Sequence, residues 1–229
     1  MSSQLPSFQR HALDFNLSSY RDRFEHHEKV MRARALATKT PLESGLQFTM
    51  DMEIPQQNSN SHSRLVPIVA PTSHVRNSTV SLRLLDPLQP GINMYSQVWA
   101  AAPIDVPDTR LVLKIIQPSM CRCPEPDDSW GWEYADPWDL AHKEAWVYRN
   151  LAHIQGLVIP YFFGLHTIIT PSQETAWVLV LEFIPGPTGD VILRSKSMPM
   201  LQNFCRLGMA AAHGLARGGW ALTDIRAPN

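Results

Sequence analysis

The sequence predicts an α+β fold, in which short strands precede and follow one central helix and a second helix comes later. Two observations predict it. Several short runs rich in Val, Ile and Leu are bounded by Pro, Asp and Ser, as strands are, whereas two longer segments repeat apolar residues at helical spacing. The 229 residues are 44% hydrophobic, which suits one or two soluble domains with a hydrophobic core.

The composition argues against several classes of protein. The net charge of -1 gives no indication of binding to nucleic acid or to a membrane surface. No apolar run approaches the roughly 18 residues of a membrane span, and the N-terminus lacks an apolar signal region. Because Cys121, Cys123 and Cys205 form no even set, we expect reduced thiols in an intracellular protein of the cytoplasm or nucleus. Cys121 and Cys123 lack a second pair at ligand spacing, which favours a plain loop over a metal site.

Residues 1–77 are expected to form an N-terminal extension, partly helical and partly disordered. Residues 18–37 are charged and compatible with a helix, on which we expect His26 and His27 at the surface. Residues 56–63, QQNSNSHS, are polar and of low complexity, which predicts a flexible linker.

A small antiparallel sheet is expected from residue 78 onward. Its predicted strands are residues 79–85, 95–101, 111–117, 159–169 and 176–184, with a turn at residues 86–91. In the strand at residues 111–117, alternation places Lys114 on one face with Val112 and Ile116. An unpaired buried ammonium costs several kcal/mol, so Lys114 either reaches water from an edge strand or pairs with an anion.

The central helix is expected to begin after Asp136, which can cap it, and to run to about Ala152. Glu144 falls inside its apolar stripe. Local pairing is poor because Lys143 and Arg149 do not lie three or four residues away. The apolar stripe consists of Leu140, Val147, Tyr148 and Leu151.

Lys114 and Glu144 carry opposite charges, and pairing them would satisfy both. A Pro/Gly break at residues 185–189 and a helix at residues 198–216 follow in the chain. The sequence ends with Asp224-Ile-Arg-Ala-Pro-Asn229.

This ordered set of features resembles the protein-kinase fold. Asp224 to Asn229 is similar to the catalytic loop D-x-K/R-x-x-N, and residues 143–164 are similar to divergent kinase-like proteins common in fungi. The resemblance implies a small lobe at residues 78–186, with a five-stranded antiparallel sheet plus one helix. It also implies an incomplete helical large lobe at residues 187–229.

The resemblance also implies roles for individual residues. Asp224 would accept the substrate hydroxyl proton, Arg226 would face the γ-phosphate of ATP, and Asn229 would hold Mg²⁺. Lys114 would contact the α- and β-phosphates, with Glu144 as its partner. Leu181 would be the gatekeeper, and the backbone of residues 182–184 would bind adenine. The implied ATP-contacting residues, besides Lys114, are Val98, Leu181, Glu182, Phe183 and Ile184.

Three departures from the family pattern limit the expected activity. Gly91 is the only glycine between residues 85 and 98, where the family has a glycine-rich loop. Leu222 and Thr223 replace the His and Arg that precede the catalytic Asp. No D-F-G triplet follows Asn229, so we expect little or no phosphoryl transfer from this chain.

Three functions stay open at this point. The chain would be an ATP-dependent Ser/Thr protein kinase with an unknown substrate, a non-catalytic kinase-like module (a pseudokinase), or a small-molecule phosphotransferase of the aminoglycoside or choline kinase type. The helix at residues 198–216 would expose its apolar stripe, which would suit a protein partner.

Overall fold

The computed structural model describes residues 19–69, 77–89, 94–127, 136–186, 191, 194 and 197–217. Its helices are α1 (Tyr20–Lys39), α3 (Pro137–Asn150) and α5 (Met198–Arg217), with short 3₁₀ turns η1 (Pro118–Met120) and η2 (Ala152–Ile154). Its strands are β1 (Gln47–Glu53), β2 (Asn77–Gln89), β3 (Gln97–Pro103), β4 (Leu111–Ile116), β5 (Phe162–Ile169) and β6 (Thr175–Glu182).

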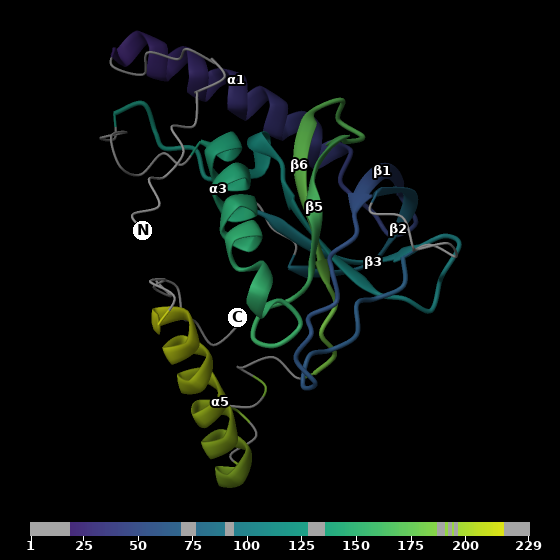
Figure 1. Ribbon diagram of the computed structural model, residues 1–229. Coiled ribbons are helices and arrows are strands. Elements are labelled where there is room, and N and C mark those ends of the chain that lie inside the picture. Colours follow the sequence, from purple (N-terminus) through teal and green to yellow (C-terminus); the bar gives the residue numbers. More distant parts are fainter. Residues whose placement is uncertain are drawn as a thin grey trace.

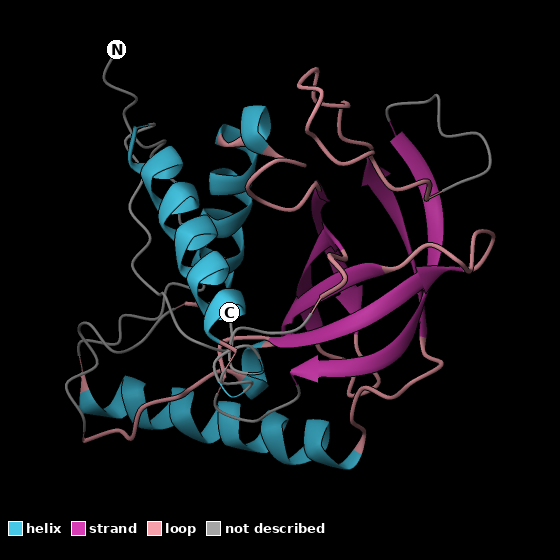
Figure 2. Ribbon diagram, turned by 90° about the horizontal axis from the view of Figure 1, so that it is seen from below, coloured by secondary structure: helices cyan, strands magenta, loops and turns pink. Residues whose placement is uncertain are grey.

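The strands form one antiparallel sheet in the order β1-β2-β3-β4-β6-β5. The sheet curls until β1 and β5 contact each other, so that it is nearly a barrel (Figures 1 and 2). The predicted α+β class is confirmed, but the sheet has six strands where five were expected. The additional strand is β1, which comes from the part of the chain expected as an extension. Its alternation is visible in the burial of Met50 and Met52 between exposed neighbours.

Side-chain alternation divides the apolar residues of the sheet between two clusters. On β4, Leu111, Leu113 and Ile115 point into the curled sheet and join its main core. Val112 and Ile116 point to the outer face, where they pack with residues of α3. The faces predicted for this strand are therefore confirmed, and the outer face is the one that carries Lys114.

Helix α3 covers the outer face of the sheet beside β5 and β6 (Figure 1). Asp136 caps the helix as predicted, because its carboxylate accepts a hydrogen bond from the Trp138 N–H at 2.9 Å. The most buried positions inside the helix are the small residues Ala141 and Ala145. Small side chains let the helix axis approach the sheet closely, which brings the longer Glu144 within reach of β4.

A turn was expected at residues 86–91, but strand β2 continues to Gln89; residues 90 and 91 lie outside the described ranges. Its pairing with β3 shifts register on both sides of Pro87, so that this proline lies at an irregularity of the ladder. Proline donates no ladder hydrogen bond and is tolerated at such bulges, so the prediction of a turn at residues 86–89 was wrong.

Helix α1 packs against the segment around η1 through polar side chains, and the expected surface position of His26 and His27 was wrong. His26 is buried, and His27 Nδ1 lies 3.0 Å from the carbonyl oxygen of Pro124. Arg34 donates to the carbonyls of Ser119 and Cys121 at 2.8 and 2.6 Å. Because His27 and Arg34 bind backbone carbonyls rather than an apolar surface, the contact leaves no hydrophobic periodicity in the sequence.

Helix α5 extends away from the sheet and makes no extensive contact with another described helix or strand (Figure 1). Leu207 of its expected apolar stripe is exposed, as is the nearby Met209. Within the described ranges, no helix is long and apolar enough to cross a membrane.

Two histidines, the buried His26 and the half-buried His166, predict how stability depends on pH. Burial lowers the pKa of His26 and of His166 below 6.5. Below pH 6.5 the unfolded chain therefore binds protons that the folded chain does not, and the free energy of unfolding falls as the pH falls. Each histidine contributes a slope of up to about 1.4 kcal/mol per pH unit.

Urea unfolding between pH 7.5 and 5 measures this effect. Replacement His166→Asn should flatten the pH dependence, whereas His62→Asn, at an exposed position, should leave it unchanged. Equal slopes for the wild type and the His166 variant would contradict the assignment.

Candidate functional site

Lys114 and Glu144 form the ion pair that the sequence predicted. The Lys114 Nζ lies 2.9 Å from Glu144 Oε1 and 2.7 Å from Oε2, which joins the middle of β4 to the second half of α3. The side chains are 29% and 27% exposed, so the pair is partly covered and solvent still reaches it. A charged ligand can therefore approach the ammonium without unfolding the site.

The structure excludes an edge-strand position for Lys114 and a local partner for Glu144. β4 lies between β3 and β6, so Lys114 is not on an edge strand. Lys143 pairs instead with Asp139 at 3.2 Å, and Arg149 pairs with Glu53 at 2.8 Å. The Glu144 carboxylate is therefore held by Lys114 on the sheet.

The neighbourhood of the pair is largely apolar. Lys114 is flanked in register by Val98 on β3 and by Leu179 on β6. Tyr148, one turn after Glu144, stacks on Phe162 with ring centroids 5.2 Å apart. Burial, and then the charge of Glu144, raises the pKa of the Tyr148 hydroxyl well above its ordinary value of 10. This apolar frame limits the conformations of both charged side chains.

The predicted base-contacting residues lie along the end of β6. Leu181 pairs in register with Val112, so it shares the outer face of the sheet with Lys114 and belongs to the same apolar cluster as α3. Glu182 is the last residue of β6, and Phe183 and Ile184 follow it. The Glu182 N–H already donates to the Tyr161 carbonyl at 2.8 Å, so this N–H is not free for adenine.

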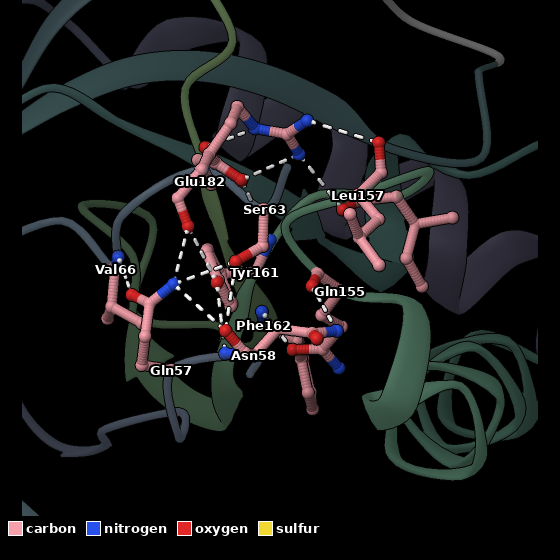
Figure 3. Close-up of polar contacts among 11 residues, drawn as sticks. Gln57, Asn58, Ser63, Val66, Gln155, Leu157, Tyr161, Phe162 and Glu182 are labelled. Atoms are coloured by element: carbon pink, nitrogen blue, oxygen red, sulfur yellow. Dashed lines mark hydrogen bonds and ion pairs between the residues drawn. The ribbon is translucent and has the colours of Figure 1, made fainter. Parts of the chain in front are cut away.

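The carboxylate of Glu182 points to the other face of the sheet and is 6% exposed (Figure 3). Arg64 binds it with two hydrogen bonds, from Nε to Oε1 at 2.7 Å and from Nη2 to Oε2 at 3.0 Å. The Tyr161 N–H donates to Oε2 at 3.0 Å. This contact was not predictable from the sequence, because Arg64 follows a polar stretch that predicted a flexible linker.

Residues 56–64, here called the strap, are held by hydrogen bonds to the loop that precedes β5 (Figure 3). The Asn58 side-chain amide donates to the His153 carbonyl at 2.7 Å, and the Asn58 N–H reaches the Tyr161 hydroxyl at 3.5 Å. Within the strap, the Gln57 side chain donates to the carbonyl of Arg64 at 2.9 Å. The segment expected as a flexible linker thus has a defined, hydrogen-bonded conformation.

The predicted catalytic-loop residues Asp224, Arg226 and Asn229 lie outside the described residues, so their position relative to Lys114 is not described. The structure brings four of the other predicted site residues together. Lys114, Glu144, Val98 and Leu181 lie on or against one region of the sheet. In the part of the chain that is described, no group of three His, Cys, Asp or Glu side chains could hold a metal ion.

No protein-family model matches the chain, and no curated protein matches it significantly.

A double-mutant cycle measures the strength of the central ion pair. Lys114→Met and Glu144→Gln should show a coupling energy on the order of 1–2 kcal/mol in urea unfolding, because both side chains are mostly covered. The exposed pair of Lys143 and Asp139 is the matched control and should give about 0.3–0.5 kcal/mol. A coupling no larger than the control would contradict the description.

The three thiols should differ in reactivity toward a disulfide reagent at pH 8. Burial raises the pKa of Cys121 to about 12, and it also raises the pKa of the half-buried Cys123. Cys205 is exposed, so it should react first and Cys121 only on unfolding. Cys205→Ser should remove the fast phase, and a fast phase that survives this substitution would contradict the assignment.

Proposed function

We propose that the chain has a kinase-like fold that binds ATP, with Lys114 contacting the phosphates. The observation that carries this proposal is the ion pair between Lys114 of an interior strand and Glu144 of the covering helix, 2.7 Å apart. Protein kinases need an equivalent strand lysine and helix glutamate, and the order of elements along the chain agrees with theirs.

The pair has the properties that phosphate binding requires. Glu144 keeps the ammonium in one orientation, and charge-assisted hydrogen bonds from an oriented ammonium to phosphate are stronger than neutral ones. The remaining exposure of Lys114 leaves room for a second anionic partner. Val98 beside it is partly exposed and offers an apolar side chain that would exclude water around the bound nucleotide.

The base would be bound at the end of β6. Leu181 supplies an apolar side chain on the face of the sheet that carries Lys114. Because the Glu182 N–H is already bonded, we assign the base contacts to the backbone of Phe183 and Ile184, which follow the strand. Ile184 is 46% exposed, so a ligand can reach it.

In the catalytic form of this proposal, phosphate is transferred from ATP to a Ser or Thr hydroxyl. Asp224 would accept the hydroxyl proton, Arg226 would face the γ-phosphate and Asn229 would hold Mg²⁺. The protein substrate is not identified by these residues.

A non-catalytic binding module is the second candidate. The exposure of Leu207 and Met209 on α5 supports it, because an apolar helix face without a described partner suits the binding of another protein. Gly91, the only glycine between residues 85 and 98, also favours weak nucleotide binding.

Thermal unfolding with Mg–ATP tests nucleotide binding. At ATP about ten times its dissociation constant, the wild-type melting temperature should rise by about 3–6 °C. Lys114→Met should lose this shift, because the phosphates lose their cation. Lys143→Met removes a more exposed lysine on the same helix as Glu144 and should keep the shift.

Two further results would separate the candidates. The absence of a shift in the wild type would contradict nucleotide binding and leave the binding module. A shift in the wild type, with phosphoryl transfer that Asp224→Ala abolishes, would support the catalytic form.

A further inference from the structure

We infer that Arg64 of the strap is a positioning residue that sets which nucleotide base the site accepts. It would act through Glu182, whose carboxylate it holds on the face of the sheet opposite to Lys114. This inference rests on the proposed function, because it concerns the base-contacting residues Phe183 and Ile184.

Glu182 is fixed by donors on three atoms. Arg64 supplies Nε and Nη2, and the Tyr161 backbone supplies its N–H, all between 2.7 and 3.0 Å (Figure 3). Removing the charged partner of a carboxylate with so little exposure would strongly destabilise the folded protein. The side chain and backbone of Glu182 therefore move together with Arg64, directly before the residues assigned to the base.

Arg64 is itself held at several points. Its Nη2 donates to the Ile159 carbonyl at 3.0 Å, and its backbone N–H donates to the Gly156 carbonyl at 2.8 Å. Its own carbonyl accepts from the Tyr161 hydroxyl at 2.8 Å. The guanidinium is thus anchored to the loop before β5 as well as to Glu182, and it can transmit the position of that loop to the end of β6.

Gly156 is the point where this anchoring requires glycine. Its φ is +76°, and an added Cβ would lie 2.4 Å from the Tyr161 ring. The close contact between loop and ring keeps the Tyr161 hydroxyl directed at the strap.

The neighbours of Glu182 are held by other elements. Leu181 packs in the cluster with α3, and the Arg110 guanidinium lies 5.8 Å from the centre of the Phe183 ring. The phosphate-binding Lys114 is on β4 and has no bond to the strap among the described contacts. A change at Arg64 should therefore alter base recognition and leave the phosphate contact intact.

The test measures the dissociation constants of Mg–ATP and Mg–GTP for the full chain by calorimetry. Arg64→Lys keeps the charge but lacks the planar guanidinium that reaches both the Glu182 carboxylate and the Ile159 carbonyl. We expect its ATP affinity to fall about fivefold, the loss of roughly one hydrogen bond, with little change for GTP. Arg149→Lys, the same exchange in the exposed pair with Glu53, should change neither value.

If Arg64 only stabilised the fold, Arg64→Lys would weaken the binding of ATP and of GTP equally. If the ratio of the two dissociation constants is unchanged in Arg64→Lys, the inference is overturned and the proposed function still stands. A wild type that binds neither nucleotide would overturn both.

Tyr161→Phe provides a second test if Arg64→Lys does not fold. It removes the hydroxyl that donates to the Arg64 carbonyl and accepts from the Asn58 N–H. The affinity for ATP relative to that for GTP should fall, but by less than in Arg64→Lys. An unchanged ratio of the two dissociation constants in this folded variant would also overturn the inference.

Discussion

The contact between Lys114 and Glu144 determines how the rest of the structure is arranged around the candidate site. It joins an interior strand to the helix that covers the outer face of the sheet, and small alanines on that helix allow the close approach. Removing either partner would leave a charge among apolar residues. This constraint explains why one lysine and one glutamate occur in segments that are otherwise suited to a hydrophobic interior.

A second ion pair, between Arg64 and Glu182, lies on the other face of the same sheet. It connects the strap to the last residue of β6 and gives the N-terminal part of the chain a structural role. Strand β1 does the same by extending the sheet toward β5. Residues 47–64 therefore contribute a strand and hydrogen bonds to the sheet, and their contacts reach the end of β6.

The parts predictable from sequence were those with a regular hydrophobic pattern. The two faces of β4 followed from side-chain alternation, and the helix cap at Asp136 followed from capping chemistry. The partner of Lys114 followed from the presence of a charged residue in each of two apolar segments. The strap, the buried His26 and the partner of Glu182 did not, because contacts made by polar side chains leave no periodic hydrophobic pattern in the sequence. Pro87 was misleading for a related reason, since a bulge accepts a residue that usually marks a turn.

Labelling with an acyl-phosphate derivative of ATP tests directly whether Lys114 lies beside the phosphates of a bound nucleotide. The reagent delivers an acyl group to an amine held beside the phosphates, and mass spectrometry identifies the modified lysine. We expect acylation of Lys114, suppressed by excess Mg–ATP and by the substitution Glu144→Gln. Acylation spread over exposed lysines such as Lys143, and unaffected by ATP, would contradict it.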